Sequence, residues 1–229
     1  MSLKPLKLYG VYGPNPSKVL DIIEELGLQY EDAGVGIGDA KKPHFVAVNP
    51  NGRLPAIYDP NTDLTLWESN AIIEYLVETY DKDNKISFPK GSNESYLCKQ
   101  WLIFQASGQG PYYGQAMFTK HHKEKVQCAI KRYYKEINRM TGVLESVLAA
   151  KEGDGPYLVG NKLNFADLCF FTWKMTIVRA IPEGMVDYLV APTVEAWVEK
   201  MVARPSVKAM QAAAIKATQA VSKATEHVS

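Results

Sequence analysis

The chain passes from its first apolar run to its first amphipathic run through residues 12–18, Tyr-Gly-Pro-Asn-Pro-Ser-Lys. Asparagine is a favoured N-cap, and proline suits the first helical position because its missing N–H would have no partner there. The stretch therefore predicts a helix that Asn15 caps and that begins at Pro16. Backbone N–H groups and the positive end of the helix dipole would gather at this turn, where they can hold an anion. A capped helix that holds no ligand would also explain the stretch.

The elements around this turn predict a small α/β domain. Residues 6–11 are almost uniformly apolar, as in a buried strand, and the run after Asn15 carries an apolar stripe as far as a stop at Gly27. A strand, a helix and a second strand in this order favour parallel pairing through a right-handed crossover. The further elements expected are a strand at 28–35, a short helix at 43–48, a β-hairpin at 56–66 and a helix that starts at 68–69.

The remainder of the chain predicts helices only. The polar segment 82–92 is interrupted by Pro89 and Gly91 and suits a linker, and helical spacing of apolar residues follows it. Residues 164–167, Asn-Phe-Ala-Asp, resemble a capping box before a buried helix. The segment from Ala209 is only weakly amphipathic and is expected to fray. The predicted division is a domain at 1–81, a linker at 82–92 and an all-helical domain at 93–229.

Composition narrows the function classes. A net charge of +1 lacks the basic footprint of nucleic-acid binding, so no nucleic-acid partner is expected. The sequence shows no apolar stretch of membrane-spanning length and no secretory leader, so no membrane partner is expected either. The three cysteines and four histidines have neither disulfide-framework nor metal-ligand spacing. We therefore expect a cytoplasmic protein without a metal.

Three features of the first domain could form one binding site. The first is the helix start at Asn15, and the second is Arg53-Leu54-Pro55 at a strand entrance. If the bond before Pro55 is cis, the Leu54 backbone would turn outward and pair with an extended peptide, as an added strand does. The third is Glu68-Ser69, which could hold an ammonium and a carboxylate. Together they predict a receptor for a short zwitterionic peptide. Purely structural explanations also exist. Pro55 could simply start an edge strand, Glu68-Ser69 could be a favourable first helical turn, and Arg53 could be a solvated surface charge.

With these motifs the chain resembles the cytosolic glutathione transferases over nearly its whole length. Within that family it is similar to the fungal nitrogen-regulator and prion-type members and their bacterial nu-class relatives. The resemblance implies an α/β thioredoxin-like N-terminal domain followed by an all-α C-terminal helical domain. The stretches that carry it are 13–15, 49–55, 67–72, 101–108, 157–163 and 164–167.

The resemblance also implies where glutathione would bind as the co-substrate. Leu54 and a cis Pro55 would present backbone to the cysteinyl unit, and Glu68 with Ser69 would hold the γ-glutamyl end. Arg53, with Lys41 or Lys42, would face the glycyl carboxylate.

Asn15 is the predicted catalytic residue, because in the subgroup it replaces the Tyr, Ser or Cys that other classes place near the sulfur. A helix N-terminus with hydrogen-bond donors lowers a thiol pKa. We therefore expect the Asn15 amide to stabilise the glutathione thiolate, with Ser17 and Tyr12 as rivals. Gly13 stands where many nu-class relatives carry a hydroxyl residue, which weakens an assignment to disulfide reduction.

The helical half is expected to bind the second substrate near the cleft. Its candidates form an aromatic, adaptable cluster, although interdomain core explains them equally well: Tyr112, Tyr113, Met117 and Phe118. By resemblance the protein would be a homodimer. The expected function is conjugation of glutathione to hydrophobic electrophiles. Glutathione-dependent disulfide reduction or peroxide reduction, and a regulatory binding module without catalysis, are the alternatives.

Overall fold

The computed structural model describes residues 2–151, 157–178 and 189–226. The chain forms two compact units. The first unit comprises Met1–Lys85 together with Ala203–Ser229, and the second comprises Ile86–Val202. The boundary at residues 85 and 86 falls inside the predicted linker, which lies between two helices without regular structure of its own.

The first unit contains a four-stranded sheet in the order β2-β1-β3-β4. Its strands are β1 (Leu6–Tyr9), β2 (Tyr30–Asp32), β3 (Ala56–Asp59) and β4 (Leu64–Trp67). Strand β2 pairs with β1 in parallel, whereas β3 pairs antiparallel with both β1 and β4. The expected parallel crossover and the expected hairpin are therefore both confirmed.

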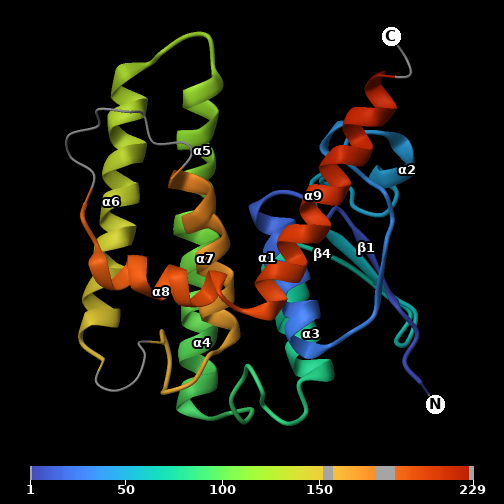
Figure 1. The fold of residues 1–229 in the computed structure, drawn as a ribbon, viewed down its shortest axis with the longest axis horizontal. Helices are drawn as coiled ribbons and strands as arrows, with labels where there is room; N and C mark the ends of the chain where they lie inside the picture. Colours follow the sequence, from blue (N-terminus) through green and yellow to red (C-terminus); the bar gives the residue numbers. More distant parts are fainter. Residues whose placement is uncertain (1, 152–156, 179–188, 227–229) are drawn as a thin grey trace. The chain divides into compact units, whose positions relative to one another are not determined.

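Among the helices of the first unit, α1 packs against two others. They are α1 (Pro14–Leu26), the 3₁₀ turn η1 (Ile37–Asp39), α2 (Pro43–Val46), α3 (Ser69–Tyr80) and α9 (Pro205–Glu226). Helix α1 packs against both α3 and α9 (Figure 1). Val19, Ile22 and Ile23 of α1 are completely buried, as are Ile72 and Ile73 of α3. The predicted stop at Gly27 is confirmed, since Gly27 adopts the left-handed conformation and ends α1.

Helix α1 begins two residues earlier than the sequence pattern indicated. Gly13, not Asn15, is its N-cap, with φ 106° and ψ 161°, and no side chain caps the helix. Glycine reaches this backbone conformation without the steric cost of a Cβ atom. Pro14 is then the first helical residue, and the Ser17 N–H donates to the Gly13 carbonyl at 2.9 Å. The prediction that Asn15 caps the helix was wrong, and Asn15 lies within the first turn.

Helix α9 differs from expectation in two ways. The segment from Ala209 does not fray but continues as helix to Glu226. In addition, α9 packs on α1 of the first unit, whereas the predicted division assigned the whole of 93–229 to the helical domain. Glu25 of α1 anchors its start: it accepts two hydrogen bonds from Arg204, at 2.6 and 3.0 Å, and one from Ser206 at 2.7 Å.

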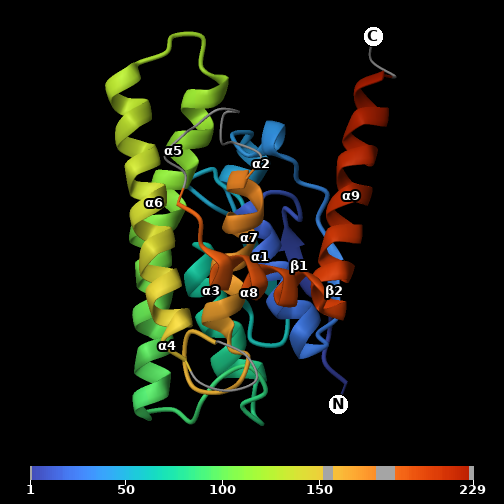
Figure 2. The same ribbon diagram turned by 60° about the vertical axis from the view of Figure 1, so that its left-hand side comes forward.

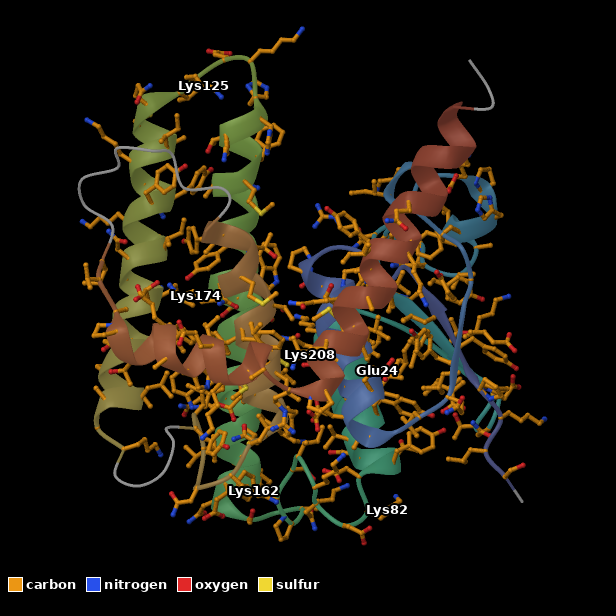
Figure 3. The ribbon with its side chains drawn as sticks, viewed as in Figure 1. Glu24, Lys82, Lys125, Lys162, Lys174 and Lys208 are labelled. Atoms are coloured by element: carbon orange, nitrogen blue, oxygen red, sulfur yellow. The ribbon has the colours of Figure 1, made fainter. Side chains whose placement is uncertain are left out.

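The regular elements in the described residues of the second unit are all helices. Its elements are α4 (Asn93–Phe104), the π-helical turn η2 (Gln105–Gln109), α5 (Gly110–His121), α6 (Gln127–Ala149), α7 (Phe165–Val178) and α8 (Pro192–Val202). Helices α5 and α6 run side by side, and both views show this pairing (Figures 1 and 2). Lys125 marks the connection between them (Figure 3). The predicted buried helix, the apolar run 168–181, is α7, whose described part is confirmed. Residues 179–181 of the run lie outside the described residues.

The capping box before α7 is confirmed. Asn164 Oδ1 accepts from the Ala166 N–H at 3.1 Å, and Asp167 Oδ2 accepts from the Asn164 N–H at 3.0 Å. The reciprocal pair satisfies backbone donors that the helix itself leaves unpaired. Within the part of the chain that the structure describes, no helix is both long and apolar enough to cross a bilayer.

Candidate active site

One row of residues across the sheet brings three distant segments to the same edge. Tyr9 lies opposite Ala56, and Ala56 lies opposite Trp67. Strands β1 and β4 end at this row and β3 begins there. The turn after Tyr9, the segment before Ala56 and the segment after Trp67 therefore all leave the sheet at one edge. These segments carry the residues predicted to converge: the first βα turn, Arg53-Leu54-Pro55 and Glu68-Ser69.

Close packing between Gly10 and Leu54 locks two of these segments together. Gly10 has φ +88°, and a Cβ atom added to it would lie 2.9 Å from Cδ1 of Leu54. Leu54 also packs against a buried cluster that includes Phe45 and Ala56. The peptide bond between Leu54 and Pro55 is cis, as the resemblance implied. The first βα turn is thus held in direct contact with the segment 53–55.

Asn49 holds the loop of residues 49–53 through hydrogen bonds. It is 1% exposed, and its Nδ2 donates to the Arg53 carbonyl at 2.6 Å while its Oδ1 accepts from the Asn51 N–H at 3.0 Å. The Gly52 N–H donates to its backbone carbonyl at 2.9 Å. One buried side chain therefore sets the path of residues 49–53, which lead into Leu54.

The two candidate lysines differ in their surroundings. Lys41 Nζ donates to the Asn51 carbonyl at 2.9 Å, so this ammonium lies at the 49–53 turn that contains Arg53. Lys42 Nζ instead lies 2.6 Å from Oδ1 of Asp39 and, by hydrogen bonding and charge, lowers the pKa of that exposed carboxyl. Of the two, Lys41 is the one placed to act with Arg53 on a ligand carboxylate.

Asn15 supplies a backbone donor at the start of α1. Pro14 and Pro16 have no N–H, so Asn15 is the sole residue of 14–16 with a backbone donor. The N-cap residue itself, Gly13, has no side chain with which to cap α1. Asn15 and Ser17 are both partly buried, whereas Tyr12 is 62% exposed.

Glu68 and Ser69 form the start of α3 at the same sheet edge. Glu68 is the N-cap residue and has a positive φ of 70°. The residue is exposed to solvent. Ser69 is the first helical residue and is buried. A helix start of this kind offers backbone donors to an anion, and the adjacent carboxylate offers an acceptor to an ammonium.

Sequence reasoning assigned no role to two buried residues at this edge. One is Asn49, which lies within the motif at 49–55. The other is Lys18, which is 2% exposed and donates from Nζ to Oδ1 of Asn70. A signal for Lys18 did exist: Lys18, Asp21 and Glu25 follow a helical spacing along α1 and are all buried.

The carboxyl groups of that stripe have opposite pKa shifts. Burial raises the pKa of Asp21 to about 7, and neither of its oxygens accepts a hydrogen bond from any described residue. For Glu25, burial acts in the same direction, but hydrogen bonds from Arg204 and Ser206 outweigh it and lower the pKa. Glu25 therefore joins α1 to the start of α9 as an ionised carboxylate, whereas Asp21, one turn before it, is a readily protonated carboxyl.

The four candidates in the helical half do not share one environment. Tyr113 is completely buried, its hydroxyl lies 3.4 Å from Oγ1 of Thr141, and its ring meets Trp173 edge-on. It belongs to the core of the helical unit, so it is not placed to touch a substrate. Phe118 is 60% exposed, whereas Tyr112 and Met117 are partly buried.

The described residues contain no group of three or more His, Cys, Asp and Glu side chains that could hold a metal ion. The candidate site instead offers helix starts, backbone groups, amides and single charges. Such a set suits an organic ligand with carboxylate, ammonium and amide groups, and it can stabilise an anion at the start of α1.

Both halves of the chain match models of the same protein family. Residues 4–78 match the glutathione S-transferase N-terminal domain, and residues 111–213 match the glutathione S-transferase C-terminal domain. The glutathione S-transferase-like protein gedE of Aspergillus terreus is 54% identical over 212 residues, which cover 90% of this chain and 94% of that protein.

Two further relatives belong to the Ure2 type. The crystal structure of the glutathione transferase URE2P6 from Phanerochaete chrysosporium, in complex with oxidized glutathione, matches with a TM-score of 0.85 and 46% identity. The match covers 93% of this chain and 98% of that one. The transcriptional regulator URE2 of Saccharomyces cerevisiae is 33% identical over 242 residues, covering 89% of this chain and 68% of the regulator.

Proposed function

Because the chain belongs to the glutathione transferase family, we propose that it binds glutathione and conjugates the glutathione thiolate to hydrophobic electrophiles. The observation that carries this proposal is the row Tyr9–Ala56–Trp67, which brings three binding segments to one sheet edge. URE2P6, whose structure holds oxidized glutathione, is 46% identical to this chain and supports glutathione as the ligand.

In this proposal each segment holds one part of the tripeptide. The backbone of Leu54, before the cis bond to Pro55, pairs with the cysteinyl unit. Glu68 and Ser69 hold the γ-glutamyl ammonium and carboxylate. Lys41 and Arg53 face the glycyl carboxylate, and Asn49 keeps their turn in place.

Asn15 acts on the sulfur. Its amide and backbone N–H, at the positive end of α1, stabilise the thiolate relative to the thiol. The thiol proton leaves to solvent, and the sulfur lone pair forms the new S–C bond while the electrophile releases its leaving group. No proton has to pass through a protein side chain. Ser17 and Tyr12 are the rival donors.

The electrophile is proposed to bind in the helical half, next to Tyr112, Met117 and Phe118. These side chains are wholly or partly accessible, and aromatic rings with a thioether adapt to varied apolar ligands. A homodimer in the cytoplasm completes the proposal.

A second candidate is glutathione-dependent disulfide reduction, because the similar URE2P6 structure contains oxidized glutathione. Here the thiolate would attack a mixed disulfide, form glutathione disulfide and release the other thiol. Gly13 counts against it. Its φ of 106° disfavours the hydroxyl residue that many nu-class relatives carry at this place.

A third candidate is a regulatory module without catalysis, supported by the 33% identity to the transcriptional regulator URE2. It predicts a folded protein that turns over no glutathione-dependent substrate.

Three assays separate these candidates. Calorimetry measures glutathione binding, an aryl halide reports conjugation, and a small mixed disulfide or a hydroperoxide reports redox turnover. We expect binding and turnover of the aryl halide. Asn15→Ala should lower kcat by tenfold or more, while Ser17→Ala and Tyr12→Phe change it little. Turnover of the disulfide alone supports the second candidate, and binding or folding without any turnover supports the third. Unchanged kinetics in Asn15→Ala would overturn the role of Asn15.

A further inference from the structure

The connection between α5 and α6 concentrates positive charge on one exposed surface. Although the whole chain has a net charge of only +1, residues 118–135 contain six lysines and arginines against a single acidic residue, Glu124. All six basic residues are exposed: Lys120, Lys123, Lys125, Lys131, Arg132 and Lys135. We call the exposed side of residues 118–135 the basic tip, because the connection forms one end of the helix pair (Figures 1 and 3).

Most of the charge on the basic tip is not compensated by the described part of the chain. Lys125 Nζ donates to the backbone carbonyls of Thr119 and Lys120, at 3.0 and 2.5 Å, and so pairs with the end of α5 and not with a carboxylate. Four further cations form neither an ion pair nor a side-chain hydrogen bond with any described residue: Lys123, Lys131, Arg132 and Lys135. The start of α6 adds to the positive field, because its first turn has no acidic residue and no side chain caps it.

Two apolar side chains stand exposed among these cations. Phe118, in the last turn of α5, is 60% exposed, and Val126, the residue before α6, is 45% exposed. Apolar side chains next to several cations are typical of proteins that dock on a membrane surface. The apolar groups enter the boundary with the acyl chains, and the cations meet anionic headgroups.

The composition of the basic tip favours a lipid surface over a nucleic acid. Five of its six cations are lysines, whereas recognition of individual phosphates favours arginine, whose guanidinium donates two hydrogen bonds in a fixed geometry. Attraction to an anionic membrane needs only charge close to the surface, which lysine and arginine supply equally well. An aliphatic side chain such as Val126 gains little on a phosphate backbone but can enter the acyl boundary.

We propose that the basic tip is a docking surface for an anionic phospholipid membrane, to which the protein binds peripherally. Its cations face the headgroups, and Phe118 and Val126 enter the acyl boundary. The expectation of no membrane partner rested on spanning length and on a leader, neither of which peripheral docking requires. Contact of Phe118 with lipid is compatible with its contact to an apolar electrophile, since such molecules partition into the same layer. The inference goes beyond the proposed function and does not depend on it.

Sedimentation with vesicles tests the docking surface on the full chain, without glutathione. The wild type should bind vesicles of phosphatidylcholine with phosphatidylserine and should not bind vesicles of phosphatidylcholine alone. High salt should weaken the binding, because it screens charges that lie in solvent. If the wild type does not bind the anionic vesicles at low salt, the proposal is overturned.

Two double variants with the same change in net charge separate the basic tip from the overall charge of the chain. Lys123→Gln with Lys131→Gln should weaken binding to anionic vesicles about twentyfold, since each lysine near the surface contributes roughly fivefold. Lys4→Gln with Lys216→Gln changes two exposed lysines of the first unit and should bind as the wild type does. Equal affinities of the two double variants would overturn the proposal.

Val126→Ser tests the apolar contact. Serine is a favoured N-cap, so this variant keeps the start of α6 while it removes the apolar side chain. It should bind anionic vesicles a few fold more weakly than the wild type, and unchanged binding would overturn the insertion of Val126. Binding to duplex DNA that the Lys123 and Lys131 variant loses, without binding to anionic vesicles, would assign the basic tip to nucleic acid and overturn the proposal.

Discussion

Asn49 Nδ2 donates a hydrogen bond of 2.6 Å to the backbone carbonyl of Arg53, four residues ahead of it. Through this bond a buried amide sets the loop that enters the cis Leu54–Pro55 bond. The loop is one of three segments at the sheet edge, so a residue with no expected ligand contact controls the geometry of the site. The relationship leads directly to a mutational test.

Replacing Asn49 with alanine should reduce both stability and glutathione affinity. The substitution leaves the Asn51 N–H and the Arg53 carbonyl without their partner, which costs about 1–3 kcal/mol of unfolding free energy. Asn61→Ala is the matched control, because Asn61 organises the β3–β4 turn through Asp59 and Lys4 in the same way. Urea unfolding and calorimetry should show stability losses in both variants but weaker glutathione binding in Asn49→Ala alone. Equal affinities in the two variants would contradict the positioning role.

Replacing Gly10 with alanine should be more damaging than the same change at Gly34. Both glycines have positive φ, at +88° and +67°, so alanine costs about 1–2 kcal/mol at either site. At Gly10 the new methyl group also meets Leu54 at 2.9 Å, whereas at Gly34 it meets no atom within 4 Å. Overpacking adds about 1–3 kcal/mol. In thermal unfolding, Gly10→Ala should therefore have a lower melting temperature than Gly34→Ala. Indistinguishable melting temperatures would show that the contact with Leu54 is not tight.

Asp21 should make the protein less stable as pH rises toward neutrality. Its pKa is raised by burial to about 7 in the folded state, against an ordinary value of 3.8 in the unfolded chain. Between these values the folded state holds a proton that the unfolded state has lost, so this residue lowers the unfolding free energy by about 1.4 kcal/mol per pH unit. Above pH 7 the loss is complete, and below the unfolded pKa it vanishes.

Asp21→Asn isolates that contribution from the other titrating groups. The amide cannot ionise, so the variant should gain stability relative to the wild type as pH rises from 4 to 7 and keep the gain at pH 8. Urea titrations across this range measure the difference. A constant difference between the two proteins would show that the carboxyl does not titrate with an altered pKa in the folded state.

Asp167 should be among the most sensitive positions of the helical unit. Its buried carboxylate accepts from the backbone N–H groups of Leu158 and Asn164 and from Nε1 of Trp197, at 2.9–3.2 Å. Asp167→Ala leaves three donors without this partner and should cost about 3 kcal/mol or more. Glu136→Ala removes one carboxylate from a partly exposed pair with Arg139 and should cost less than about 1 kcal/mol. Similar losses in the two variants would exclude a central role for Asp167.

The sequence determined the local elements of the fold and most of the candidate residues. Apolar runs and turn formers placed the strands and helices of the first unit, because these signals act over a few residues. The motif at 164–167 predicted its own capping box for the same reason. The segments at residues 12–18, 53–55 and 67–69 were also chosen from sequence, by their residue types and by family resemblance.

Tertiary structure decided which of these residues meet and in what state. The pairing of Tyr9, Ala56 and Trp67 joins positions far apart in the chain, which no local pattern specifies. Gly13 starts α1 ahead of Asn15 because the backbone takes a conformation that suits glycine, and this places Asn15 within the first turn and not at the N-cap. The burial of Lys18 and the packing of α9 on α1 depend on helices that approach from other parts of the sequence. Hydropathy reports how polar a residue is, whereas only the folded arrangement determines whether that residue is enclosed and what it touches.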